Sequence, residues 1–301
     1  MDPLKQYAIL GPTASGKTAL ALDLARQTGG NILSLDSLAV YRHIDIASAK
    51  PAQTERGSVP HFGLDLIDPD MPFDVTEFIH SYHRAADDAR ARNVPLIIAG
   101  GSGFYLKMLI EGISPLPDIS DTLQQEVQQM LEDLREAYSV LMRIDPALAR
   151  TIEPTDRYRI EKALLIARAT HAAPTDYFRA HPPVPVITTP LPLYEIVIAR
   201  PLLRERIALR TAKMLRDGLI DEVCNLERHY TRAPHPMKAI GIREVLDYLD
   251  GIFTYEQMRE AIITHTARLA KRQVTFNKTQ FDTVFRGTAQ EIRDAIWGSL
   301  K

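Results

Sequence analysis

Cysteine is nearly absent from this sequence, because the 301 residues include only Cys224. An internal disulfide and a metal cluster built from cysteines are therefore excluded. Cys224 lies in a helical pattern at 220–226, where we expect a buried packing residue rather than a nucleophile. The nine histidines show no metal-ligand spacing. His80 and His83, on one helical pattern, are expected to be surface residues.

Long apolar runs are missing as well. None approaches the roughly 20 residues that a membrane-spanning helix needs, and residues 1–5 do not have the pattern of a signal peptide. With 45% hydrophobic and 25% charged residues, the composition is that of an ordinary globular protein. These features favour a cytoplasmic enzyme that does not bind a membrane, and we expect it to act as a monomer.

An excess of one charge is also lacking, because 36 Lys and Arg residues face 38 Asp and Glu residues. This balance argues against nonspecific nucleic-acid binding, although it permits a local basic surface. Residues 266–278 are such a candidate, with four cations, an interleaved Phe276 and no acid. The spacing of these cations suits contact with a nucleic-acid backbone. A solvated helix face is the ordinary alternative.

Glycine is absent from residues 114–217. The periodicity in the first half of this segment predicts helices at 121–136, 137–143, 146–151 and 156–170. A proline-rich, stiff connector follows at 182–192. We therefore expect a helical insertion domain at 114–193, and a core formed by residues 1–113 and 194–301.

Strands and helices alternate in the core segments, which predicts an α/β fold with a parallel sheet. We expect strands at 7–10, 31–35, 95–99 and 194–199, with the second beside the first, and a helix at 75–92. The C-terminal region is predicted to be helical at 203–217, 221–230, 242–249, 255–278 and 289–297. No internal repeat or low-complexity segment interrupts this pattern.

The most informative motif is GPTASGKT at 11–18, which fits the phosphate-binding loop pattern G-x-x-x-x-G-K-[ST]. A strand precedes the motif and a helix follows it, as a P-loop NTPase-like core requires. The glycines let the backbone N–H groups face one anion. The candidate diphosphate-binding residues of this loop are Gly11, Thr13, Ala14, Ser15, Gly16, Lys17 and Thr18. The Thr18 hydroxyl suits Mg²⁺. The motif predicts a bound phosphate or diphosphate and, although ATP-binding and other nucleotide-binding proteins carry it, does not identify ATP.

Two further loops follow predicted strands, at Asp36–Ser37 and at 100–103. Ligands of parallel sheets lie beyond the carboxyl ends of the strands, so we expect these loops to meet the phosphate loop at one pocket. Asp36 suits a base for the accepting group of a transfer reaction. A helix cap or an outer-sphere Mg²⁺ ligand is the structural alternative for Asp36.

Several basic residues could bind phosphate oxygens. Arg206 and Arg210 lie one helical turn apart, and a guanidinium binds phosphate in a bidentate manner. Spacing alone makes each a weak candidate, as it does Lys50 and Lys107. His61 could line the pocket.

Six stretches together resemble, in order, the signature motifs of the tRNA dimethylallyltransferase family, which prenylates an adenine next to the anticodon. They are residues 11–18, 36–51, 100–116, 156–164, 237–244 and 271–276. The resemblance implies that dimethylallyl diphosphate binds the loop from Thr13 to Thr18, with Mg²⁺ at Thr18 and Arg210 on the phosphates. Asp36 matches the family's general base for the N6 amine of adenine. The catalytic residues would thus be Asp36, Thr18 and Arg210, and the acceptor the anticodon stem-loop of tRNA.

The resemblance also implies a set of tRNA contacts. They are Asp36, Ser37, Leu38, Ala39, Ser102, Tyr158, Arg159, Lys162, Lys238, Gly241, Arg243, Lys271, Arg272, Gln273 and Lys278. Some positions depart from the family pattern. Ala47–Ser48 stands where Gly-Thr is usual, Gln124 where members carry an arginine near the tRNA, and Ile242 where tyrosine is frequent.

Three other functions remain open from the sequence. An ATP-dependent small-molecule kinase would share the loop and Asp36, but would leave the basic stretch and the insertion unexplained. Prenyl transfer to a free adenine nucleotide is disfavoured by the tRNA-type segments at 238–243 and 271–278. An RNA-binding protein without catalytic activity would leave the phosphate loop without a role.

Overall fold

The computed structural model describes residues 4–300. Residues 1–3 and Lys301 lie outside the described residues. The expectation of no signal peptide falls partly on residues 1–3. The chain divides into two compact units, which we call the insertion unit, Ile110–Val186, and the core unit, which comprises the remaining residues. The insertion was expected at 114–193. The chain already rejoins the core at Ile187, whose N–H donates to the Leu109 carbonyl at 2.8 Å.

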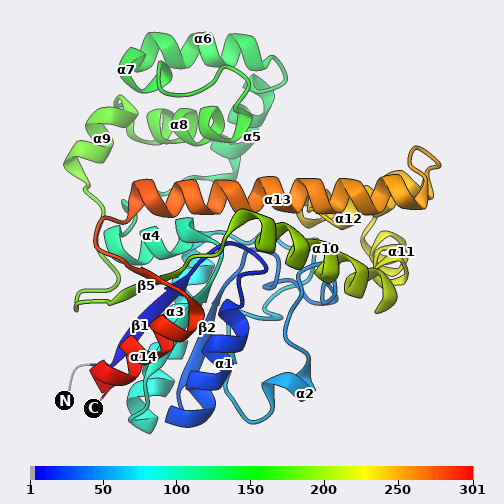
Figure 1. The fold of residues 1–301 in the computed structure, drawn as a ribbon. Coiled ribbons are helices and arrows are strands. Elements are labelled where there is room, and N and C mark those ends of the chain that lie inside the picture. Colours follow the sequence, from blue (N-terminus) through cyan, green and yellow to red (C-terminus); the bar gives the residue numbers. More distant parts are fainter. Residues whose placement is uncertain (1–3, 301) are drawn as a thin grey trace. The chain divides into compact units, whose positions relative to one another are not determined.

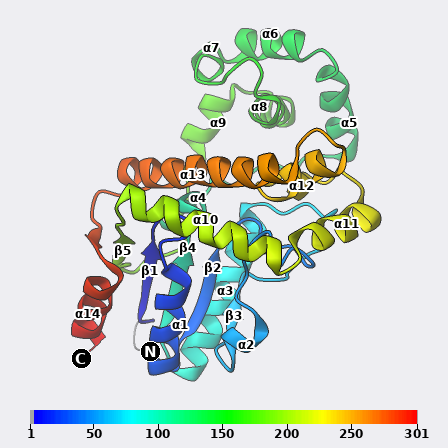
Figure 2. The same ribbon diagram turned by 45° about the vertical axis from the view of Figure 1, so that its right-hand side comes forward.

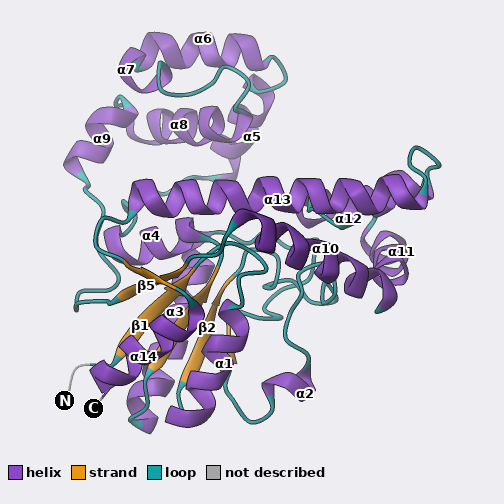
Figure 3. Cartoon of the chain, in the orientation of Figure 1, coloured by secondary structure: helices purple, strands orange, loops and turns teal. Residues whose placement is uncertain are grey.

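The core unit contains a six-stranded, fully parallel sheet with the order β3-β2-β4-β1-β5-β6 (Figures 1 and 3). The strands are β1 Gln6–Leu10, β2 Asn31–Leu35, β3 His61–Phe62, β4 Leu96–Gly100, β5 Leu193–Ile196 and β6 Phe285–Gly287. This confirms the α/β fold with a parallel sheet. The expectation that β2 lies beside β1 was wrong, because β4 lies between them. Residues 96–99 of β4 are all buried, as a central strand requires.

Helices cover both faces of the sheet. α1 (Lys17–Thr28) and α14 (Ala289–Leu300) share one apolar cluster with β1 and β5. α3 (Val75–Arg92) packs on the opposite face, where the Tyr82 hydroxyl donates to Gln6 of β1 at 3.0 Å. α2 (Gln53–Arg56) and α4 (Gly103–Glu111) complete this part of the core unit. The phosphate-loop helix therefore begins at the carboxyl ends of the strands.

The C-terminal helices of the core unit are α10 Arg200–Arg216, α11 Leu219–Tyr230, α12 Ile242–Leu249 and α13 Tyr255–Gln280, with a short 3₁₀ helix at His235–Lys238. α10 and α13 lie side by side in both views (Figures 1 and 2). Their buried residues form a second apolar cluster with Val40, Tyr41 and Ile44 of the loop after β2. The prediction that Cys224 is buried was wrong: α11 packs through Val223 and Leu226, which leaves Cys224 exposed.

The insertion unit is entirely helical in its regular elements (Figure 3). Its helices are α5 Asp121–Met130, α6 Leu134–Ile144, α7 Pro146–Ala149, α8 Arg157–Thr170 and α9 Pro174–Ala180. They enclose a separate core around Val127, Leu141 and Leu164. The predicted helix at 121–136 is interrupted, because Asp133 caps a new helix by accepting from the Glu136 N–H. Across residues 4–300, we find no helix with the length and apolarity needed to cross a membrane.

Candidate functional site

The phosphate loop connects β1 to α1 through unusual backbone conformations. Gly11, Ala14 and Gly16 have φ values of 147°, 63° and 99°. A Cβ atom at Gly11 would lie 3.1 Å from the Ile196 carbonyl oxygen, so a side chain does not fit there. Gly16 caps α1 without a side-chain hydrogen bond, which leaves N–H groups of the first turn for an anion. The loop therefore has the form that the motif predicts.

Two cations converge on this loop. The Lys17 ammonium is buried and donates to the Pro12 carbonyl at 2.7 Å. Arg210 of α10 donates to the Thr13 hydroxyl at 2.8 Å. Burial, together with the nearby charge of Arg210, lowers the pKa of Lys17 to about 7, while Asp36 acts in the opposite direction. A bound anion would relieve this repulsion between two cations.

Arg206 also reaches the loop, but differently. Its guanidinium donates to the Ser15 carbonyl at 3.3 Å, and the residue is exposed. Lys107 bonds Gln280 at 2.6 Å and does not line the cavity described below. Of the basic candidates, Arg210 is therefore the one that meets the phosphate loop from within the site.

Asp36 directly follows β2. One carboxylate oxygen accepts from the Leu38 and Ala39 N–H groups at 2.8 and 3.3 Å, which is a local turn of the Asx type. The capping alternative is thus present in this geometry. Burial lowers the pKa of Arg210 as it does that of Lys17, and the Asp36 carboxylate opposes both shifts, so it also acts on the groups around the phosphate loop. Asp36 has one oxygen committed to the turn and lines the cavity.

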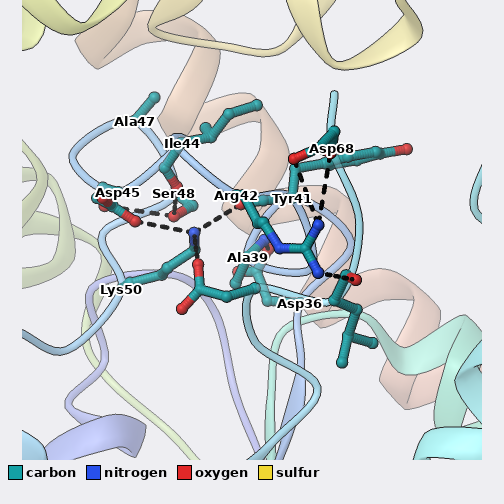
Figure 4. Close-up of polar contacts among 12 residues, drawn as sticks. Asp36, Ala39, Tyr41, Arg42, Ile44, Asp45, Ala47, Ser48, Lys50 and Asp68 are labelled. Atoms are coloured by element: carbon teal, nitrogen blue, oxygen red, sulfur yellow. Dashed lines mark hydrogen bonds and ion pairs between the residues drawn. The ribbon is translucent and has the colours of Figure 1, made fainter. Parts of the chain in front are cut away.

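Lys50 fixes the loop that follows Asp36. Its ammonium donates to the Tyr41 carbonyl at 2.6 Å and to Asp45 and Asp65 at 2.9 and 2.6 Å (Figure 4). The side chain is 1% exposed. These three partners use all the donors of the ammonium. Lys50 is therefore a structural residue of this loop rather than a phosphate ligand.

Glu222 of α11 holds the far end of the same loop. Its carboxylate accepts from the backbone N–H groups of Asp45, Ile46 and Ala47 at 2.9, 2.7 and 2.9 Å. Burial raises the pKa of this carboxyl, and the three N–H groups oppose that shift. Ala47 lines the cavity. The carboxylate thus positions part of the cavity wall.

Replacing Glu222 by glutamine is expected to loosen this wall, because an amide NH₂ would face N–H donors. We expect a loss of about 1–3 kcal/mol in the free energy of unfolding, the usual range when hydrogen bonds from part-buried N–H groups to a carboxylate are lost. Chemical denaturation of Glu222→Gln measures this loss. Glu227→Gln is the control, because Glu227 lies on the same helix and pairs with the Arg232 side chain rather than with backbone N–H groups. Equal stability of the two variants would contradict this role.

The three loops enclose one cavity of about 290 Å³. The prediction that 11–18, Asp36–Ser37 and 100–103 meet at one pocket is confirmed. Its polar lining residues include Thr13, Lys17, Thr18, Asp36, Ser37, Ser102 and Arg210. His61 also lines the cavity, with its Nδ1 bonded to the Val59 carbonyl at 2.8 Å.

The sequence reasoning did not identify the apolar part of the cavity lining. Its residues include Ala47, Ile207, Met214, Ala239, Ile240, Ile262 and Leu269. α10 and α13 each contribute one stripe at helical spacing. Such spacing is the same signal that a packing face gives, so the sequence alone could not distinguish the two. A lining that combines cations with apolar side chains suits an amphiphilic phosphate ester.

The predicted tRNA contacts are distributed over both units. In the core unit, the exposed cations are Lys238, Arg243, Lys271, Arg272 and Lys278. Leu38, Ala39 and Gln273 line the cavity, and Gly241 is buried. In the insertion unit, Tyr158, Arg159 and Lys162 are exposed on α8, with the Lys162 ammonium 5.6 Å from the centre of the Tyr158 ring.

Known proteins resemble this chain over nearly its whole length. The model of the IPP transferase family matches residues 39–280, and that of the isopentenyl transferase family matches residues 4–65. A tRNA dimethylallyltransferase of Sulfurovum sp. (strain NBC37-1) is 53% identical over 98% of both chains. One of Sulfurimonas denitrificans is 46% identical, over 99% of this chain and 100% of that protein.

A solved structure supports the same relationship. The tRNA isopentenylpyrophosphate transferase of Bacillus halodurans is 29% identical, with a TM-score of 0.71 over 99% of this chain and 97% of that one. The phosphate loop, the sheet and the signature motifs thus occur together in a chain that aligns end to end with these relatives. This protein therefore belongs to the IPP transferase family.

Proposed function

We propose that this protein transfers a dimethylallyl group from dimethylallyl diphosphate to the N6 amine of the adenine on the 3′ side of the tRNA anticodon, releasing diphosphate. Its relatives carry the name tRNA dimethylallyltransferase. The observation that carries the proposal is the cavity lining, which combines the cations Lys17, at the start of α1, and Arg210 with apolar side chains of α10 and α13. A kinase would leave the basic stretch of α13 and the insertion unit without a role.

The donor would bind with its diphosphate on residues Thr13 to Thr18 and its hydrocarbon group between α10 and α13. Lys17 and Arg210 would contact the phosphates, and Ile207, Met214 and Ile262 would surround the hydrocarbon. Negative charge gathers on the diphosphate as its bond to the allylic carbon breaks. Donors that already face that position stabilise the charge without reorganisation.

The donor set also fits Mg²⁺. The Thr18 hydroxyl lines the cavity, and Mg²⁺ prefers such hard oxygen ligands. Among the described residues, no group of three His, Cys, Asp or Glu side chains could hold a metal alone. Diphosphate oxygens would complete the coordination, as is usual for this ion. Bound there, Mg²⁺ would neutralise charge on the departing diphosphate.

Asp36 would act on the accepting amine. The lone pair of an exocyclic adenine amine is delocalised into the ring, so the amine attacks poorly unless a base takes its proton as the C–N bond forms. The carboxylate oxygen of Asp36 outside the local turn suits that task. The adenine would leave the base stack to reach the cavity, as bases do in other base-modifying enzymes.

The exposed cations of α13 would contact the tRNA backbone. Replacing both Lys271 and Arg272 by alanine is expected to weaken tRNA binding about tenfold and to reduce its salt dependence. Binding measured at several salt concentrations tests this. Unchanged affinity and slope would assign the tRNA contact to another surface.

The reaction is tested by label transfer. Labelled dimethylallyl diphosphate and Mg²⁺ would be supplied with unmodified tRNA bearing adenine after the anticodon, and with AMP and ATP as parallel acceptors. Label in tRNA alone is the expected result. An equal rate on AMP would favour a cytokinin-type enzyme. ATP consumption without label in any acceptor would replace the proposal by the kinase alternative.

A further inference from the structure

We infer that Gln273 is a positioning residue of the diphosphate site rather than a tRNA contact. The inference rests on the proposed diphosphate site and departs from the role that the family resemblance implies for this residue. Its neighbours on α13, Lys271 and Arg272, are exposed, whereas Gln273 lines the cavity.

The side-chain amide of Gln273 bonds the phosphate loop directly. Its carbonyl oxygen accepts from the Thr13 backbone N–H at 2.8 Å. Arg210 bonds the hydroxyl of the same threonine at 2.8 Å. α10 and α13 therefore hold Thr13 from two sides, one through its side chain and one through its backbone. The two bonds fix where the phosphate loop begins.

The other half of the amide fits against the loop after β4. A Cβ atom at Gly101 would lie 2.3 Å from the Gln273 nitrogen, so only glycine leaves room for the amide at this rotamer. The backbone of Gly101 has no positive φ that would itself require glycine. Gly101 thus leaves the space that the Gln273 amide occupies.

The next turn of α13 repeats this arrangement. Asn277 is 1% exposed and donates to Glu195 of β5 at 2.9 Å. A Cβ atom at Gly103 would lie 2.6 Å from the side-chain Oδ1 of Asn277. Two amides, one turn apart, therefore fit against two glycines of the Gly-Gly-Ser-Gly segment. Asn277 anchors the helix to the sheet, and Gln273 connects that anchored helix to the phosphate loop.

The consequence is measurable without tRNA. Replacing Gln273 by methionine keeps the length of the side chain but removes the oxygen that accepts from Thr13. We expect binding of inorganic pyrophosphate in the presence of Mg²⁺ to weaken about tenfold, because the loop loses a hydrogen bond that fixes it. The KM for the prenyl donor should rise with it, while the affinity for tRNA changes less than about twofold.

Lys271→Met is the matched control, since it lies on the exposed side of the same helix. It should weaken tRNA binding and leave pyrophosphate binding unchanged.

Gly101→Ala supplies an independent variant, because its methyl group displaces the Gln273 amide without altering the Gln273 residue. Gly101→Ala should weaken pyrophosphate binding in the wild-type background. In a protein that already carries Gln273→Ala, it should have no further effect on that binding, which a double-mutant cycle measures.

The outcomes separate the inference from the function on which it rests. If the wild type binds pyrophosphate and Gln273→Met and Gly101→Ala bind it with the same affinity, the role of Gln273 alone is overturned. Failure of the wild type to bind pyrophosphate would overturn the diphosphate site and this inference together. Loss of tRNA affinity in Gln273→Met with unchanged pyrophosphate affinity would return Gln273 to the tRNA contacts.

Discussion

Replacing Asp36 by asparagine is expected to lower turnover by about 10² to 10⁴, the usual contribution of a general base. The asparagine side-chain oxygen can still accept from the Leu38 and Ala39 N–H groups, so the local turn is retained. The change therefore removes the basic group while it preserves the loop. Single-turnover rates with saturating donor and tRNA measure the effect on chemistry, and the dissociation constant of tRNA should stay nearly unchanged.

Ser37→Ala is the control for Asp36→Asn, because Ser37 is the exposed next residue and also lines the cavity. Because Ser37 is also an expected tRNA contact, this variant is compared at saturating tRNA, where its turnover should remain within a fewfold of the wild type. Turnover of Asp36→Asn close to that of Ser37→Ala would reject Asp36 as the base. The carboxylate would then be a capping group of the loop.

Replacing Arg210 by methionine should reduce turnover by about 10² to 10³, as removal of a preorganised donor to a developing anion usually does. The variant also removes a cation that lowers the pKa of Lys17, so that pKa should rise. The remaining ammonium becomes more completely protonated at neutral pH and offsets part of the loss. The rate constant for chemistry and the KM of the donor separate the two effects.

Arg206→Met tests whether any arginine near the loop would have the same effect. Arg206 lies one turn earlier on α10, is exposed, and bonds a backbone carbonyl of the loop at 3.3 Å. We expect less than about a threefold change in turnover. Comparable losses in both variants would mean that general positive charge, rather than the contact between Arg210 and Thr13, supports the reaction.

The sequence was sufficient where local chemistry determines structure. The phosphate loop requires glycine at fixed positions and a lysine beside them, so the local pattern of residues 11–18 alone predicts it. The order of the strands could not be derived in the same way. Whether β2 or β4 lies beside β1 depends on long-range packing, because residues 31–33 of β2 and residues 96–99 of β4 are all buried. β3 and β6 are too short to show periodicity.

The cavity wall illustrates a second limit. Met214 and Ile262 have the spacing of ordinary packing residues, and the sequence does not indicate that their stripes face a cavity. Gln273 lies inside a segment that the family resemblance assigns to tRNA contact. Only the three-dimensional contact with Thr13 distinguishes it from Lys271 and Arg272. A polar residue among cations gives no sign of which side of its helix it occupies.

The 26 residues of α13 form one uninterrupted helix. Each residue advances an α-helix by about 100°. A single insertion or deletion between Tyr255 and Leu269 would therefore rotate every later side chain, moving Gln273 off Gly101 and shifting the exposed cations with it. Such length changes should be tolerated poorly in this helix. Variation in length among relatives should accumulate in other segments, whose register does not link two substrates.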